Sequence, residues 1–131
     1  MIVVDASALA PALADDGDSG DLARSRLLSE QLTSPELVDL ETLSVFRGLV
    51  LAGKLPARRA QLALVDLAAL PLERVAHAQL LTRCWELYPN LTVYDAAYVA
   101  LAEMLDVSLV TGDSRIARAP GIQCAVEVLG A

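Results

Sequence analysis

Four acidic residues are the candidates for chemistry in this sequence, because each stands beside or within an apolar segment. Asp5 directly follows a short apolar run, and Asp113 follows another after a single glycine. Glu41 and Asp95 lie within longer segments that are mostly apolar. Carboxylates gathered at one place repel each other strongly unless a cation lies between them. Mg²⁺ suits such a group, because it prefers oxygen ligands and keeps several of its waters.

Asp5 and Asp113 are predicted to lie at the ends of two β-strands. Residues 2–4 are apolar and β-branched, and residues 107–111 form the clearest second strand. Gly112 permits a tight turn before Asp113. Ligands bind beyond the carboxyl ends of parallel strands, so both aspartates should project from the same edge of the sheet. The alternative role for each is to cap the helix that follows.

Glu41 is predicted to lie in the middle of a helix. Ser34 as N-cap and Pro35 in the first turn begin this helix, which runs to about Ala52 and ends at Gly53. Glu41 lies one turn from apolar residues on either side, and burying a lone carboxylate is costly. The alternative is a boundary position at which the carboxylate reaches water.

Asp95 is predicted to lie in the first turn of a helix over residues 92–105. The spacing from Thr92 resembles a capping box, which is an ordinary reason for an acid at this position. The rest of the helix is nearly all apolar and is therefore expected to be buried on most sides. Asp95 would then carry its charge into the interior.

Short apolar strands alternate with helices along the whole chain, which predicts a parallel sheet with helices on both faces. The other predicted strands cover residues 31–33, 71–75 and 122–126. The other predicted helices cover residues 5–14, about 22–28, 55–70 and 77–88, and residues 15–20 form a polar loop.

Composition narrows the class of protein. The 131 residues fit one domain, residues 1–131, and 55% of them are hydrophobic, enough for a core without disulfides. The net charge is −7, from 10 basic and 17 acidic residues, which argues against a broad basic surface for nucleic acid. This charge suits carboxylates that hold cations, or a partner that carries basic residues.

The sequence has few histidine and cysteine residues that could take part in catalysis or bind a metal ion. His77 is the only histidine, which argues against a Ser-His-Asp triad or a histidine zinc site. Cys84 and Cys124 form no CxxC pair and are expected to be reduced thiols. No run of eighteen apolar residues and no basic region before an apolar stretch is present. We therefore expect no membrane span, no secretory signal and a cytoplasmic location.

The chain resembles the PIN-domain nucleases, and specifically the VapC-type toxins of bacterial toxin–antitoxin pairs. The resemblance covers essentially the whole chain. Each motif alone is weak, but four of them in this order are specific. They are the segments Ile2–Leu9, Ser34–Glu41, Tyr94–Ala102 and Leu109–Asp113.

The resemblance implies a three-layer α/β/α sandwich around a parallel sheet of four or five strands. It also implies an endoribonuclease whose Mg²⁺, or Mn²⁺ as a substitute, is held by the acids at positions 5, 41, 95 and 113. Ser7 and Thr111 match hydroxyl positions that support these carboxylates. Arg115 matches a frequently basic position that touches a phosphate, and its alternative role is a surface ion pair. Some members carry a further acid where this chain has Val99, which favours a single bound Mg²⁺.

The expected reaction is hydrolysis of structured RNA by water that the metal ion activates, leaving a 5′-phosphate and a 3′-hydroxyl. The resemblance implies a homodimer and a small antitoxin, which could insert an Arg or Lys among the carboxylates. The helices between residues 36 and 70 either offer this antitoxin an apolar groove or simply form the core.

Two other functions stay open. One is a PIN-fold protein that only binds its partner and has no activity. The other is a different Mg²⁺-dependent phosphoryl-transfer protein. Against the latter, Lys54 is the only lysine, and residues 5–7 read Asp-Ala-Ser where a phosphatase has Asp-x-Asp.

Overall fold

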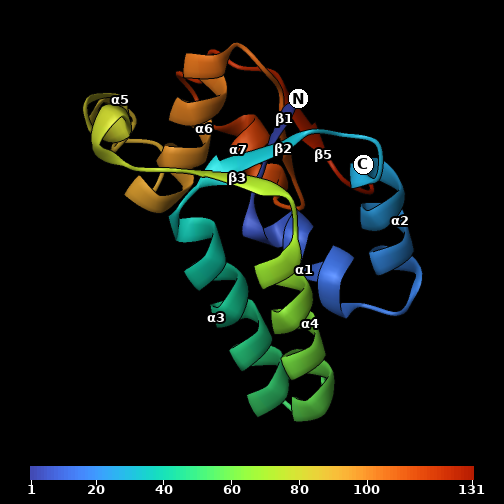
Figure 1. Cartoon of the computed structure of the whole chain (residues 1–131). Coiled ribbons are helices and arrows are strands. Elements are labelled where there is room, and N and C mark those ends of the chain that lie inside the picture. Colours follow the sequence, from blue (N-terminus) through green and yellow to red (C-terminus); the bar gives the residue numbers. More distant parts are fainter.

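A five-stranded sheet, parallel throughout, forms the centre of the protein in a computed structural model that describes residues 1–131 (Figure 1). The strand order is β3-β2-β1-β4-β5. Their bounds are β1 Ile2–Val4, β2 Leu32–Pro35, β3 Leu72–Val75, β4 Leu109–Thr111 and β5 Val126–Val128. Because β1 and β4 are neighbours in this order, Asp5 and Asp113 come to the same edge of the sheet.

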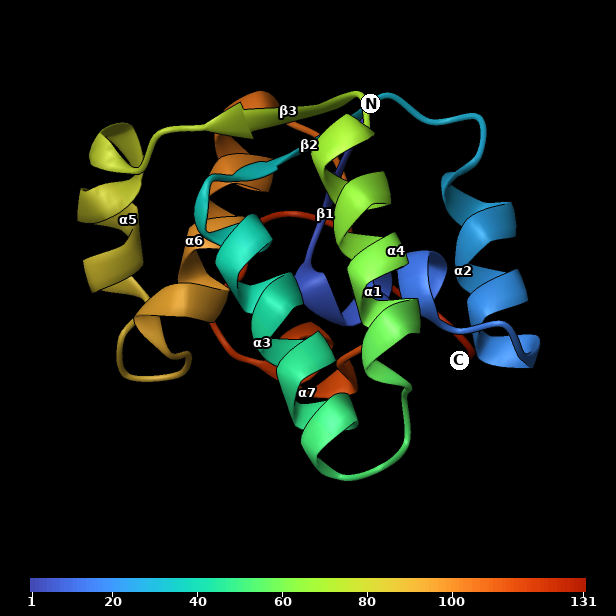
Figure 2. The same cartoon turned by 60° about the horizontal axis from the view of Figure 1, so that its bottom comes forward.

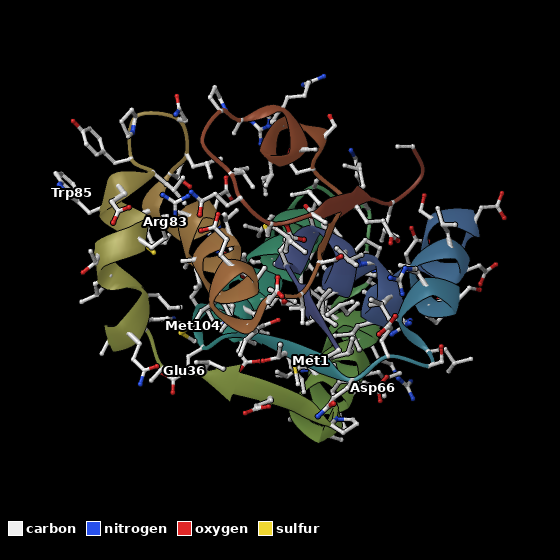
Figure 3. The ribbon with its side chains drawn as sticks, turned by 90° about the horizontal axis from the view of Figure 1, so that it is seen from above. Met1, Glu36, Asp66, Arg83, Trp85 and Met104 are labelled. Atoms are coloured by element: carbon white, nitrogen blue, oxygen red, sulfur yellow. The ribbon has the colours of Figure 1, made fainter.

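Helices cover both faces of the sheet, as the sequence predicts. Figure 3 shows α5 and α6 on the opposite side of the sheet from α1 and α2. None of the helices combines the length and the apolar character that crossing a membrane requires. Their bounds are α1 Ala6–Ala14, α2 Asp18–Leu27, α3 Leu37–Leu51, α4 Ala57–Ala69, α5 Leu81–Glu86, α6 Val93–Leu105 and α7 Ser114–Arg118, with a short 3₁₀ turn at Ala78–Leu80 before α5.

The core lies where the sheet meets α6 and α1. All three residues of β1 and of β4 are buried, as expected for strands covered on both faces. Residues 96–102 of α6 are buried without interruption, so this helix is enclosed on most sides. The prediction of a deeply buried helix that carries Asp95 at its first turn is therefore confirmed.

Helices α3 and α4 form a hairpin that extends away from the sheet (Figures 1 and 2). Gly53 takes a φ of 72° in the turn after α3, which is a conformation that favours glycine. A second, smaller apolar cluster around Phe46 and Ala63 joins the hairpin to α1. Helix α3 thus packs mainly against α1 and α4 and only at its start approaches the sheet.

The predicted helix start at Ser34 and Pro35 is wrong. Both residues belong to β2, and α3 begins at Leu37. The Ser34 hydroxyl is buried and donates to the carbonyl oxygen of Val4 at 2.5 Å. Pro35 pairs with Val75 in the parallel ladder. Sheet pairing therefore outweighs the local preference of a Ser-Pro pair for a helix N-terminus.

Further differences from the sequence prediction concern α2, β5 and α7. Helix α2 begins at Asp18 within the predicted loop, where Asp18 and Asp21 lie favourably near the positive end of the helix dipole. The last strand covers 126–128 instead of 122–126, because its register is set by pairing with β4. The short helix α7, which Asp113 caps, was not predicted.

Candidate active site

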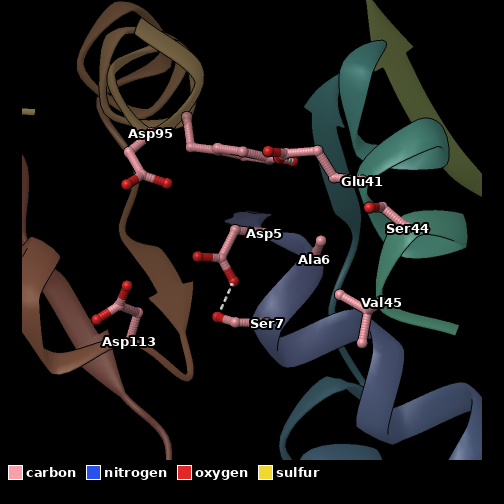
Figure 4. A pocket seen from close by; sticks show the side chains of 9 residues that line it. Asp5, Ala6, Ser7, Glu41, Ser44, Val45, Asp95 and Asp113 are labelled. Carbon is pink, nitrogen blue, oxygen red and sulfur yellow. Dashed lines mark hydrogen bonds between the residues drawn. The ribbon is translucent and has the colours of Figure 1, made fainter. Parts of the chain in front are cut away.

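All four predicted acids line one pocket at the carboxyl edge of the sheet (Figure 4). Figure 4 shows Asp5 in the middle, Asp95 and Asp113 on one side and Glu41 on the other. The pocket volume is about 330 Å³. No lysine or arginine is among its lining residues, which are Asp5, Ala6, Ser7, Glu41, Ser44, Val45, Asp95, Tyr98 and Asp113.

Asp5 is held in place by hydrogen bonds to both of its carboxylate oxygens. The Ser7 hydroxyl donates to Oδ1 at 2.7 Å, and the Thr111 hydroxyl donates to Oδ2 at 2.5 Å. The backbone N–H of Ala8 also donates to Oδ1, at 3.2 Å, so Asp5 is at the same time the N-cap of α1. The ordinary capping role and the site role therefore coexist in one side chain.

Ser7 and Thr111 connect the first strand to the fourth. Their hydroxyl oxygens are 3.1 Å apart, and the Ser7 hydroxyl accepts from the backbone N–H of Gly112 at 2.8 Å. A Cβ at Gly112 would come within 2.9 Å of the Ser7 carbonyl oxygen, so only glycine fits this approach. The Thr111 hydroxyl accepts from the N–H of Asp113 at 3.0 Å. This network holds the first and last acids together.

Burial raises the pKa of Asp5 to about 6. Removal from water is the largest cause, and the charge of Asp95 adds to it. The hydrogen bonds from Ser7, Thr111 and Ala8 act in the opposite direction but do not cancel the effect of burial. A cation beside Asp5 would supply the missing stabilisation of the carboxylate.

Glu41 and Asp95 are half-buried, and burial is also the main cause that raises the pKa of each carboxyl group. The charge of Asp113 raises the pKa of Asp95 further, and the charge of Asp95 raises that of Glu41. The Thr92 hydroxyl accepts from the N–H of Asp95 at 3.1 Å, which confirms the predicted N-cap. Val45, one turn after Glu41, is 37% exposed, so Glu41 lies at the rim of the pocket rather than in the core.

Asp113 differs from the other acids because it has a basic partner. The guanidinium of Arg115 contacts both carboxylate oxygens, with Nη2 2.7 Å from Oδ2 and Nε 3.0 Å from Oδ1. These contacts lower the pKa of Asp113. The Arg115 side chain is 81% exposed, so the surface ion pair named as its alternative role is the arrangement in this structure.

The donor set fits a hard divalent cation. Four carboxylates face one pocket, and burial, with repulsion between them as a smaller cause, raises the pKa values of three. No three acidic, histidine or cysteine side chains are arranged to hold one ion directly. This geometry suits Mg²⁺, which is usually bound by one or two carboxylates and reaches other groups through its waters.

Histidine and cysteine have no part in the pocket. His77 is not among the lining residues; it lies at the start of α3, where its Nε2 accepts from the N–H of Leu37 at 3.1 Å. Cys84 and Cys124 are both free thiols, as predicted. Any chemistry in the pocket therefore depends on carboxylates, hydroxyls and what they bind.

Tyr98 is the pocket residue whose contact the sequence did not reveal. Its hydroxyl donates to Oε1 of Glu41 at 2.5 Å. Tyr98 lies one turn after Asp95, which places both residues on one face of α6. This spacing could have indicated that Tyr98 lies near the pocket. Nothing in the sequence indicates that Glu41 is the partner of Tyr98, because the two residues are 57 positions apart.

Sequence comparison finds relatives along nearly the whole chain. Residues 2–122 match the profile of the PIN domain. Ribonuclease VapC1 of Mycobacterium tuberculosis is 41% identical over 128 residues, which are 97% of this chain and 96% of that relative.

Structural comparison finds the same fold in two solved structures. VapC20 of Mycobacterium tuberculosis, described as a Sarcin-Ricin loop cleaving toxin, superimposes with a TM-score of 0.72 at 17% identity, over 94% of this chain and 97% of that chain. VapBC2 of Rickettsia felis, bound to a DNA fragment from its promoter, gives 0.67 at 17% identity, over 98% and 99%. At this identity the two likenesses concern the fold, and they agree with the predicted α/β/α architecture.

Proposed function

The chain belongs to the PIN-domain family, and from this premise we propose that it is a divalent-metal-dependent endoribonuclease and the toxin of a toxin–antitoxin pair. The observation that carries the proposal is the pocket in which four carboxylates converge with no basic residue in its lining. Its relatives over nearly the full length are named as VapC ribonucleases. In this proposal residues 1–131 form a single PIN domain that acts in the cytoplasm.

Asp5, Glu41, Asp95 and Asp113 would hold the metal ion, Mg²⁺ or its substitute Mn²⁺, directly or through water. A bound Mg²⁺ supplies activation of water and neutralises the charge that develops on the leaving oxygen of a phosphodiester. The absence of an acid at position 99, where Val99 is fully buried, favours one firmly held ion. The products would carry a 5′-phosphate and a 3′-hydroxyl.

The side chains around the acids have separate roles in this proposal. Ser7 and Thr111 keep the Asp5 carboxylate oriented, since they donate to its two oxygens. Arg115 is exposed and can leave Asp113 for a phosphate of the RNA backbone, which guanidinium groups bind well. The RNA would then approach from the side of α7.

Two surfaces support the proposed protein partners. An apolar groove between α3 and α4 is lined in part by Phe46, Val50 and Leu64. It suits the apolar face of a helix from a small antitoxin. A basic residue of the same antitoxin would then bind the carboxylates of the pocket. Leu81 and Trp85 on α5 form an exposed stripe with Tyr88 just after this helix, and Figure 3 shows Trp85 pointing outward. The stacked rings of Trp85 and Tyr88 suit burial against a second copy in a homodimer.

The experiment that tests the function is RNA cleavage in Mg²⁺ by the Asp5→Asn variant. We expect cleavage by the wild type and by the control Asp66→Asn, whose exposed carboxylate on α4 lies outside the pocket. Asp5→Asn should lose cleavage while it stays folded. Full activity of Asp5→Asn would overturn the proposal. Absence of cleavage by the wild type, with no Mg²⁺-dependent rise in melting temperature, would favour a binding protein without activity.

A further inference from the structure

Tyr98 is a large polar side chain placed almost completely inside the protein. It is 1% exposed and is among the largest fully buried side chains. A buried tyrosine hydroxyl normally finds a hydrogen-bond partner, and here the partner is the carboxylate of Glu41. Burial and the neighbouring acids raise the pKa of Tyr98, so the hydroxyl keeps its proton and acts as a donor.

The hydrogen bond joins two parts of the molecule that pack separately. Glu41 is on α3, which packs mainly against α1 and α4. Tyr98 is on α6, which packs mainly against α5 and the strands β1 and β2. The contact therefore ties the projecting α3–α4 hairpin to the buried helix that also carries Asp95.

Glu41 has no other fixed contact in the protein. Its Oε1 accepts from Tyr98, and its Oε2 accepts from no side chain or backbone group. The neighbours of Glu41 on the pocket side, Ser44 and Val45, are exposed and do not confine it. A glutamate side chain loses much rotamer freedom when it is ordered, so a carboxylate without this contact would sample many positions.

We propose that Tyr98 is a positioning residue that holds the carboxylate of Glu41 at the pocket so that Oε2 is presented to the divalent cation. The inference rests on the proposed function, because it assigns Glu41 to the same metal site. Tyr98 does not touch RNA or the ion in this assignment, and its effect passes through Glu41. It does for Glu41 what Ser7 and Thr111 do for Asp5.

The test compares Tyr98→Phe with Tyr94→Phe, which removes a hydroxyl from an exposed tyrosine that does not line the pocket. Mg²⁺ affinity is measured by titration calorimetry, and melting temperature is measured without metal. Loss of a group that orients a metal ligand typically weakens metal affinity about 10–100-fold. We expect a decrease of that size for Tyr98→Phe and none for Tyr94→Phe. Saturating Mg²⁺ should restore most of the RNA cleavage of Tyr98→Phe.

A cycle with Glu41→Gln determines whether the effect passes through Glu41. In the Glu41→Gln background, Tyr98→Phe should lower Mg²⁺ affinity little further. Wild-type Mg²⁺ affinity in Tyr98→Phe would overturn the inference, and so would an equal loss in both backgrounds. A change in the metal-free melting temperature alone would show a purely structural role. If Asp5→Asn abolishes cleavage while Tyr98→Phe binds Mg²⁺ normally, this inference fails and the proposed function stands.

Discussion

The two halves of the pocket are held in different ways. In the half built on strand ends, Asp5 receives hydrogen bonds on both oxygens from groups on two neighbouring segments. In the half built on helices, Glu41 receives a single hydrogen bond, and the only side-chain partner of Asp95 is Thr92 at the start of the same helix. Asp5 is therefore the fixed point of the pocket, and the helix half depends on fewer contacts, with Glu41 held by Tyr98 alone.

The same contrast appears between the two strand-end aspartates. Asp5 and Asp113 follow neighbouring strands, yet the pKa of Asp5 is raised and that of Asp113 is lowered. Asp5 is buried among neutral hydroxyl donors, whereas Asp113 is more exposed and contacts the cationic Arg115. A shared position in the fold thus does not set the charge state, and the immediate neighbours do.

The largest expected effect comes from removing the negative charge of Asp5, the fixed point of the pocket. Asp5→Asn should decrease RNA cleavage by at least about 100-fold, since loss of merely supporting groups costs about 10–100-fold. The same change should stabilise the metal-free protein at pH 7 by about 1–3 kcal/mol, because a carboxylate with a pKa near 6 is costly to bury in ionised form. Chemical denaturation in a chelator measures the change in stability, and a less stable variant would contradict the cost assigned to burying the ionised carboxylate of Asp5.

Removing the Thr111 hydroxyl should have the next largest effect. Thr111→Val leaves one buried oxygen of Asp5 without a donor, which should destabilise the protein by about 1–3 kcal/mol. Mg²⁺ affinity should decrease about 10–100-fold. The control is Thr82→Val on α5, whose exposed hydroxyl makes no hydrogen bond to the protein. Equal stability and equal Mg²⁺ affinity of the two variants would mean that Thr111 does not hold Asp5 in place.

The pH dependence follows from the raised pKa of Asp5. Between about pH 4 and pH 6 the folded protein holds a proton on Asp5 that the unfolded chain releases. The contribution of Asp5 to the stability of the metal-free protein therefore decreases as pH rises through this window. Mg²⁺ competes with the same proton, so its affinity should rise up to about pH 6 and then level off. Calorimetry at several pH values measures this, and an affinity that is equal at pH 5 and pH 7 would contradict it.

The smallest effect is expected at the exposed ion pair. Arg115→Gln removes the partner of Asp113 and should return its pKa toward the usual range. Surface ion pairs contribute little, so RNA cleavage should change by less than about tenfold, mainly through KM. Arg58→Gln, an exposed arginine on α4 without an ion pair, is the matched control. A loss as large as that of Asp5→Asn would place Arg115 in the chemistry itself.

Much of the fold was predictable because it depends on local patterns. The apolar β-branched run at residues 2–4 and the enclosed helix over residues 93–105 follow from residue type and periodicity. The sequence prediction failed where contacts with a distant segment determine the secondary structure. Ser34 and Pro35 look like a helix start in isolation, but pairing with β3 and a hydrogen bond to Val4 draw them into the sheet.

The sequence by itself determined which side chains carry charge, that two of them end strands and that the site depends on oxygen ligands. Position at strand ends was enough to predict that Asp5 and Asp113 meet, because parallel strands finish at one edge. Only the tertiary structure decided that Tyr98 holds Glu41. This contact depends on how α3 and α6 pack around the pocket. Side-chain partners that are distant in sequence leave no local pattern from which they could be predicted.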